Sequence, residues 1–85
     1  MPSGATFDRL TRVLRDVFDD DALIATPDLT AKKVFGWDSL GNVRFFVEIE
    51  RAFGVRFTAA EMSSLRNVGQ LAELIEKKSV SRNQL

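Results

Sequence analysis

Apolar residues recur at the spacing of amphipathic helices in four separate stretches of the chain. The first predicted helix covers residues 6–18, with apolar positions on one face and charged residues on the other. A second covers residues 39–53, a short third ends near residue 65, and a fourth begins at Val68. Because every predicted element is helical, the pattern predicts an all-α four-helix bundle with a long first loop and a short third helix.

Capping signals indicate where these helices begin and end. Asp38 is a favoured N-cap residue directly before the second helix, and Gly54 follows its last turn. Residues 58–61 have the sequence of a capping box, and residues 67–70 repeat its spacing before the fourth helix. These signals support the boundaries that the hydrophobic period predicts.

The connection over residues 19–38 has no sustained period and is long for a compact domain. Its acidic run over residues 19–21 opposes the dipole at the end of the first helix, so we predict a solvated turn there and not a metal site. Residues 31–35 are predicted to form a helical turn. We expect the apolar residues of the loop to hold it against the helices: Leu23, Ile24, Leu29, Val34, Phe35 and Trp37.

Composition then narrows the possible chemistry. At 85 residues the chain is one small domain, which we place at residues 1–78, followed by a flexible polar tail over residues 79–85. Twelve basic residues balance twelve acidic ones, which argues against nucleic acid as a partner. Without cysteine or histidine there is no thiol nucleophile, imidazole base or zinc–thiolate site. No apolar run is long enough to cross a bilayer, so we expect a cytoplasmic monomer without a membrane partner.

Candidate chemistry is concentrated in residues 36–40, Gly-Trp-Asp-Ser-Leu, at the head of the second helix. Ser39 is predicted at the first helical position, beside the positive end of the helix dipole. The helix after Ser39 has one stripe that is predicted to be buried: Asn42, Phe45, Phe46, Ile49 and Phe53. A second, shallower stripe lies on a neighbouring face: Leu40, Val43, Val47 and Arg51. A reactive hydroxyl beside an apolar surface stripe suggests a phosphate-linked attachment point with a docking surface.

The chain resembles the acyl carrier protein family from about residue 7 to residue 77. The resemblance is carried by Asp38-Ser39-Leu40, by the run from Phe45 to Val55 and by the segment from Asn67 to Leu71. It implies that a phosphopantetheinyl transferase attaches 4′-phosphopantetheine from coenzyme A to Ser39. Acyl groups would then be held as thioesters on the thiol of this arm, and the chain would be a carrier with no catalytic residues.

The resemblance also implies roles for the residues around Ser39. Asp38 would bind magnesium transiently while the arm is delivered, in addition to capping the helix, and no permanent metal is expected. Acyl-loading enzymes and acyl-transferring or condensing enzymes would dock, like the transferase, on one face of the second helix: Asp38, Leu40, Val43, Arg44, Val47 and Arg51.

The second helix departs from the acidic pattern of carriers in fatty-acid synthesis. Arg44 and Arg51 offset Glu48 and Glu50, so the field that steers basic partners is weak. This favours a specialised polyketide- or fatty-acid-type pathway, with an aminoacyl or peptidyl carrier as the alternative. Gly41, inside the first turn, costs up to about 1 kcal/mol relative to alanine. The sequence suggests for it only that it leaves room near the arm.

Two other classes of protein, a hydrolase and a helical interaction domain, are alternatives to a carrier. The stretch around Ser39 loosely matches Gly-Asp-Ser-Leu esterases, but those enzymes need a preceding strand, a histidine base and a longer α/β chain, so we exclude them. A helical interaction domain in which Ser39 is only a cap residue stays open. The mass of the chain after treatment with coenzyme A and a transferase distinguishes it from a carrier.

Overall fold

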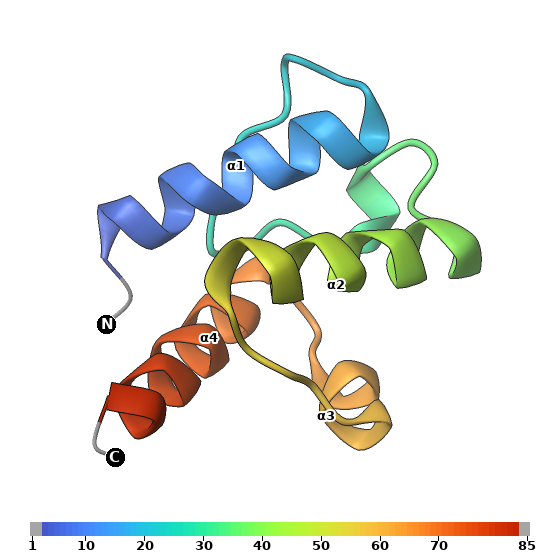
Figure 1. The fold of residues 1–85 in the computed structure, drawn as a ribbon. Coiled ribbons are helices and arrows are strands. Elements are labelled where there is room, and N and C mark those ends of the chain that lie inside the picture. Colours follow the sequence, from blue (N-terminus) through green and yellow to red (C-terminus); the bar gives the residue numbers. More distant parts are fainter. Residues whose placement is uncertain (1–2, 84–85) are drawn as a thin grey trace.

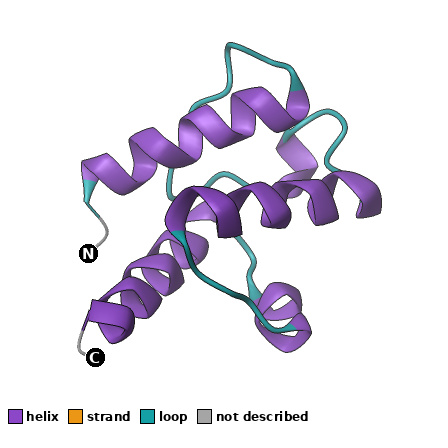
Figure 2. Ribbon diagram, viewed as in Figure 1, coloured by secondary structure: helices purple, strands orange, loops and turns teal. Residues whose placement is uncertain are grey.

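The structure is a computed structural model that describes residues 3–83, with side chains described as far as Ser79. This part of the chain consists of helices and loops without any strand (Figure 2). In chain order the elements are α1 (Gly4–Phe18), the 3₁₀ helix η1 (Ala31–Lys33), α2 (Ser39–Phe53), α3 (Ala59–Ser64) and α4 (Val68–Asn83). The predicted four-helix bundle, with its long first loop and short third helix, is confirmed.

Helices α1 and α2 run antiparallel, and the interface between them is the most extensive of the helix pairs (Figure 1). Arg9 of α1 joins the two at the end of α2, where its guanidinium lies 4.3 Å from the centre of the Phe53 ring and donates to the carbonyl of Ala52. A cation at this position complements the negative end of the helix dipole. Helix α4 crosses beneath the pair, and its last turns lie on the same side as the start of α1 (Figure 1).

The core is made by the inward faces of α1, α2 and α4. Its largest fully buried side chains are Leu10, Leu14, Phe45, Ile49, Val68 and Ile75. Phe46 is also buried, so the predicted inner stripe of α2 is confirmed at its centre. Asn42 and Phe53, at the two ends of that stripe, are only half-buried. None of the helices in residues 3–83 is long and apolar enough to cross a membrane.

Most predicted helix ends agree with the structure. Asp38 caps α2, Gly54 ends it in the left-handed region at φ 66°, and residues 58–61 form the predicted capping box of α3. At α4 the prediction is half right. The Asn67 side chain accepts the Gln70 N–H at 2.8 Å, but the Gln70 side chain bonds the backbone N–H of Arg66 and not that of Asn67.

Two predicted boundaries are wrong. Helix α1 begins at Gly4, earlier than residue 6, because the hydroxyl of Ser3 accepts the N–H of Thr6 and caps the helix there. Helix α4 continues to Asn83, so residues 79–83 are helical where a flexible tail was predicted. No glycine or proline stands in that segment to stop the helix. Residues 84 and 85 of the predicted tail lie outside the described residues.

The long loop over residues 19–38 is fastened to α1 by hydrogen bonds. The hydroxyl of Thr11 accepts the N–H of Ala25 at 2.9 Å, and Arg15 donates to the carbonyl of Leu23 at 2.8 Å. Asp19 ends α1 in the left-handed region at φ 50°, and the acidic run after it is exposed, as predicted. Within residues 3–83 no group of acidic side chains is arranged to hold a metal.

The other end of the loop is fastened to α4. The N–H groups of Val68 and Gly69 donate to the carbonyls of Leu29 and Pro27, each at 2.9 Å. Loop carbonyls therefore satisfy the first amides of α4, which a helix cannot satisfy itself. A β-carbon on Gly69 would lie 2.8 Å from the Pro27 oxygen, so this close approach requires glycine.

Only some of the apolar loop residues hold the loop in place. Val34 is buried, and Leu23, Leu29 and Trp37 are half-buried against the core, as predicted. The prediction is wrong for Ile24 and Phe35, whose side chains are 60% and 98% exposed. Hydrogen bonds to the loop backbone already hold the loop at both ends, so these two side chains are not needed to fasten it. The turn predicted at residues 31–35 is present as η1.

Candidate functional site

Ser39 is the first residue of α2 and its side chain is exposed to solvent. Asp38 before it is extended, and its carboxylate accepts the N–H of Gly41 at 2.9 Å. The Asp38 carbonyl accepts the N–H of Asn42 at 2.8 Å. Asp38 is therefore an N-cap residue, as predicted, and its capping bond fixes the helix start on which Ser39 stands.

The start of α2 has features that suit a phosphate ester. With Gly41 and Asn42 bonded to Asp38, the N–H groups of Ser39 and Leu40 have no intrahelical acceptor. They lie at the positive end of the dipole of a 15-residue helix. Such amides favour an anion by about 0.3–1 kcal/mol at an exposed helix end. The residues present therefore fit an exposed serine that carries a phosphate-linked group.

Aromatic packing supports the loop just before Ser39. The Trp37 ring lies 5.3 Å from the Phe18 ring and 4.8 Å from the Phe45 ring, between centroids. Its indole N–H donates to the Asn42 side chain at 2.9 Å. The Trp37–Asn42 bond thus joins the residue before the cap to the beginning of α2, on either side of Ser39 in the chain.

Gly41 is needed because the loop backbone passes directly over it. A β-carbon at this position would lie 2.4 Å from the carbonyl oxygen of Gly36 and 3.0 Å from the ring of Phe18. Gly36 itself adopts φ +88°, a conformation that other residues rarely take. The structure thus gives a reason for Gly41 that the sequence did not show: it makes room for the loop that brings the chain to Asp38.

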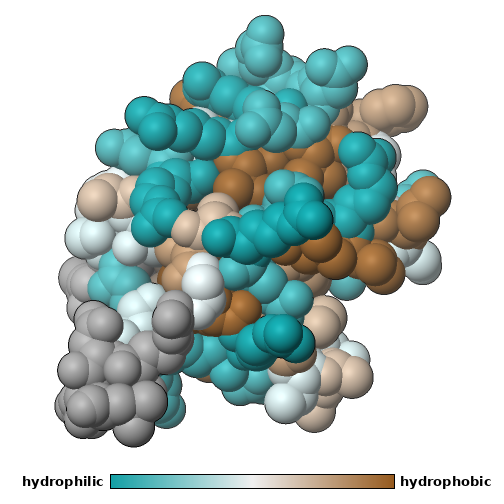
Figure 3. Space-filling view, in the orientation of Figure 1, coloured by the Kyte–Doolittle hydropathy of each residue, from teal (hydrophilic) through white to brown (hydrophobic). Residues whose placement is uncertain are grey.

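The outer face of α2 is exposed along its length. Leu40, Val43 and Val47 are 70%, 59% and 44% exposed, and Arg44 and Arg51 are exposed beside them. Apolar surface gathers where α2 begins, at the right of the space-filling view (Figure 3). The predicted docking residues therefore share one accessible face, although Arg51 lies roughly 18 Å along the helix from Ser39.

The two carboxylates in the second half of α2, Glu48 and Glu50, have different partners. Glu48 pairs with Arg51 at 3.5 Å, while Glu50 turns toward the chain after the helix and accepts the N–H of Phe57 at 2.9 Å. Within residues 3–83, no ion pair joins Arg44 to an acidic side chain. This face therefore carries no strong excess of either charge, because Arg44 and Arg51 are offset by Asp38 and Glu48.

Phe35, near the site, was predicted from the sequence to pack the loop against the helices, but it is exposed. It lies four residues before Ser39, and its ring is almost fully in solvent. The available signal was the apolar pair Val34-Phe35 next to a glycine, because only one of two neighbouring residues can point inward there. In the structure Val34 is the buried one.

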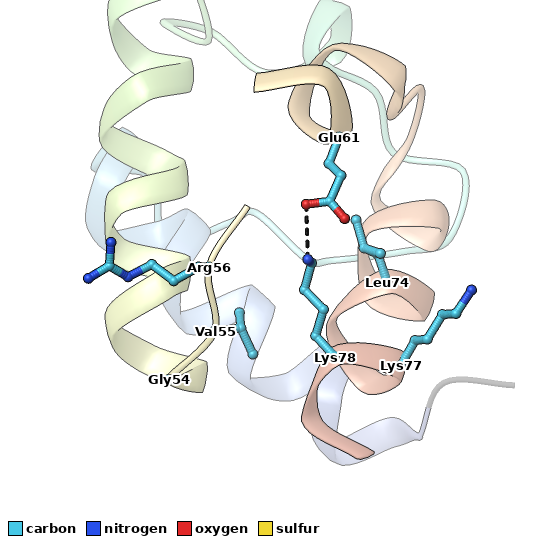
Figure 4. A pocket seen from close by; sticks show the side chains of 7 residues that line it. All are labelled: Gly54, Val55, Arg56, Glu61, Leu74, Lys77 and Lys78. Carbon is cyan, nitrogen blue, oxygen red and sulfur yellow. Dashed lines mark ion pairs between the residues drawn. The ribbon is translucent and has the colours of Figure 1, made fainter. Parts of the chain in front are cut away.

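A wide hollow of the described surface lies away from Ser39, at the other end of α2 (Figure 4). Its volume is about 590 Å³, and Lys78 reaches across it to pair with Glu61 at 2.9 Å. Its lining contains none of the predicted site residues: Gly54, Val55, Arg56, Glu61, Leu74, Lys77 and Lys78. The candidate site is therefore an exposed helix tip and not a pocket.

A four-helix bundle that presents one serine at the tip of its second helix is a small helical carrier domain. Residues 8–75 match the family described as "Phosphopantetheine attachment site". The acyl carrier protein of Helicobacter pylori is 31% identical over 72 residues, which cover 85% of this chain and 92% of that protein. The holo acyl carrier protein of Geobacter metallireducens, solved by NMR, superposes with a TM-score of 0.87 at 37% identity, covering 93% and 91% of the two chains.

The chain therefore belongs to the acyl carrier protein family. It is a carrier and not a catalyst, and its cofactor is covalently attached 4′-phosphopantetheine. Acyl-handling enzymes and a phosphopantetheinyl transferase are the partners that this family implies.

Proposed function

We propose that Ser39 is the attachment residue and that the chain presents acyl intermediates to the enzymes of a specialised polyketide- or fatty-acid-type pathway. When bound, the arm supplies the thiol that the chain lacks, on which acyl groups are held as thioesters. The protein's own residues hold the attachment point, satisfy the charge beside it and offer a surface to partners.

The observation that carries this proposal is the exposed Ser39 hydroxyl on a helix start whose first two amides have no intrahelical acceptor. At α4 the equivalent amides of Val68 and Gly69 are bonded to the loop. A phosphodiester on Ser39 would find both donors and the positive helix end beside it. Within the matched residues 8–75, no other serine begins a long helix.

Each neighbouring residue has a proposed part in this function. Asp38 caps the helix and would bind magnesium while the phosphate is delivered, because a carboxylate beside a phosphate repels it without a cation. Leu40, Val43 and Val47 would provide apolar contact with partner enzymes. Arg44, and Arg51 near the far end of the helix, would orient those partners and contribute less affinity.

The pathway is inferred from the charge of α2. A face on which Arg44 and Arg51 offset the carboxylates lacks the strong acidic field that would attract basic partners. This supports a dedicated set of partner enzymes. Loading assays with acyl- and aminoacyl-coenzyme A, in which the whole arm is transferred with its cargo, would show which cargo the downstream enzymes accept. Exclusive use of an aminoacyl cargo would support the peptidyl-carrier alternative.

Modification of Ser39 can be tested directly. The chain is incubated with coenzyme A and a broad-specificity phosphopantetheinyl transferase, and its intact mass is measured. We expect one arm on the wild type and none on Ser39→Ala, whose circular dichroism and melting temperature should match the wild type. Ser63→Ala, an exposed serine on α3, is the control and should accept the arm normally. An arm on Ser39→Ala would contradict the proposal.

A further inference from the structure

A small cavity lies beside the attachment site, between the loop, the first turns of α2 and the junction of α3 with α4. Its volume is about 50 Å³, and its walls include Trp37, Asn42, Phe46 and Leu71. Asn42 follows Ser39 by three residues, which places both on the same side of α2. An engineered protein cavity that takes up benzene measures about 150 Å³, so this one has space for only about two carbon atoms.

Trp37 is the bulkiest wall of this cavity and is held there from several sides. Its ring packs against Phe18 of α1 and Phe45 of α2, with centroids 5.3 and 4.8 Å away. Its only polar atom, the indole nitrogen, donates to Asn42 at 2.9 Å. Because that N–H is satisfied inside the protein, the ring can stay in place without leaving a donor unpaired.

We propose that Trp37, held by Asn42, closes the helix bundle beside Ser39, so that this carrier keeps its cargo outside the bundle and is suited to short or polar acyl groups. The inference rests on the proposed attachment at Ser39. Trp37 would be the residue that determines the cargo class, and Asn42 would act through it as a positioning residue. A long apolar chain would remain in water, where its cost rises with exposed area, whereas a short or polar group has little apolar area to protect.

The hollow at the other end of α2 is not a suitable binding site for a long acyl chain. It lies at the opposite end of α2, about 22 Å along a 15-residue helix. Three cations take part in its lining, Arg56, Lys77 and Lys78, and the Lys78–Glu61 pair spans it (Figure 4). A charged and open surface of this kind gives a hydrocarbon chain little protection from water.

The test compares acetyl- and octanoyl-loaded forms of the wild type, Trp37→Ala and the control Phe35→Ala. Phe35 is an aromatic residue of the same loop that is exposed and does not line the cavity. Intact mass first establishes that each form is loaded, and the melting temperatures are then compared. We expect the two loaded forms of wild type and of Phe35→Ala to differ by less than about 1 °C. In Trp37→Ala, octanoyl should raise the melting temperature by about 4 °C or more over acetyl.

Asn42→Ala provides a second variant in case Trp37→Ala does not fold. Trp37 is the only tryptophan of the chain, so its fluorescence reports directly on this wall. In Asn42→Ala the emission should shift on octanoyl loading, and in the wild type it should not. A wild type stabilised by octanoyl, or variants that respond like the wild type, would overturn the inference.

A third measurement does not depend on the arm. Benzene is added to the unmodified wild type, Trp37→Ala and Phe35→Ala, and melting temperatures are recorded. Benzene should stabilise only Trp37→Ala, because removal of the indole opens the cavity. If mass spectrometry finds no arm on Ser39, the proposed function fails and the cargo inference fails with it. The benzene result still shows separately whether Trp37 closes the cavity, and stabilisation of the wild type by benzene would mean that it does not.

Discussion

Gly41 stands where α2 and the loop before it pass closest to each other. The carbonyl of Gly36 lies over it, and the ring of Phe18 lies beside it. A helix would gain from alanine at this position on propensity alone. The contact with the loop outweighs that gain, since Gly36 already has a positive φ and cannot easily shift.

Gly41→Ala should therefore destabilise the protein by about 1–3 kcal/mol, the usual cost of overpacking, despite its better helix propensity. The measurement is urea unfolding followed by circular dichroism. Gly4→Ala is the matched control, because a β-carbon there meets no atom within 4 Å, and its stability should stay within about 0.5 kcal/mol of the wild type. Equal stability of Gly41→Ala and the wild type would mean that the loop yields at no cost.

Asp38 allows its two proposed roles to be separated. Asparagine keeps the capping oxygen, so Asp38→Asn should melt close to the wild type. It removes the negative charge that a magnesium ion needs, so transfer of the arm to Ser39 should slow at least about tenfold at limiting magnesium. Initial rates with coenzyme A and a transferase measure this. Asp8→Asn, at an exposed site on α1, is the control, and equal rates for all three proteins would leave Asp38 as a cap only.

At the scale of elements, α2 divides its residues between the core and an exposed face, which we propose as the docking surface. Phe45, Phe46 and Ile49 are buried, while Leu40 and Val47 on the opposite side are exposed. Burying one such side chain in a partner is worth about 1.5–3 kcal/mol, and an exposed charge pair is usually worth less than about 1 kcal/mol. Apolar contact should therefore dominate the affinity of this face.

Val47→Asp on the loaded carrier should weaken its use by an acyl-transferring partner by about tenfold or more, because a charge would replace a buried apolar contact. Arg44→Ala should change it only a few-fold. Carrier concentration is varied in kinetic assays at low and high salt. Ile24→Asp, an exposed apolar position outside α2, is the control for the added charge. A steep salt dependence, or a larger effect from Arg44→Ala, would point to a partner with an acidic docking surface.

At the scale of the whole molecule, hydrogen bonds to carboxylates join distant parts of the chain. The Glu76 carboxylate of α4 accepts the hydroxyl of Thr6 at 2.6 Å and the N–H of Ser3 at 2.7 Å, which ties α4 to the start of α1. These bonds, first that from Thr6, lower the pKa of Glu76 below its ordinary value. The N–H of Thr58 likewise lowers the pKa of Glu61 at the start of α3.

The lowered pKa of Glu76 predicts how stability depends on pH. A carboxylate stabilised in the folded chain contributes fully above its ordinary pKa of 4.5, and the contribution is lost as pH falls through the lower folded value. The melting temperature should therefore fall below about pH 4.5, and Glu76→Gln should show a smaller fall. Thermal scans from pH 7 to pH 3 measure this. Glu73→Gln, exposed on the same helix, is the control and should follow the wild type. If the melting temperatures of Glu76→Gln and the wild type fall in parallel with pH, the hydrogen bonds of Glu76 to Thr6 and Ser3 do not cause the pH dependence.

Most of the helices could be predicted because their signals are local. Amphipathic period and capping residues act over a few positions, so α2 was located from Asp38 to Gly54 and α3 from its capping box. The start of α1 and the end of α4 differ from the prediction, because the hydroxyl of Ser3 caps α1 and because no residue in the polar segment after residue 78 opposes a helix.

By itself the sequence determined most of the helices, the family and the position of Ser39 at the start of α2, since these depend on residue type and spacing. Tertiary structure decided which side chains of the loop face inward, why Gly41 is glycine, and that Trp37 and Asn42 bond beside the site. Each of these depends on segments that meet only when the chain folds. The period of a helix can be recognised from neighbouring residues in the sequence. How closely two backbone segments approach each other depends on how the whole chain packs.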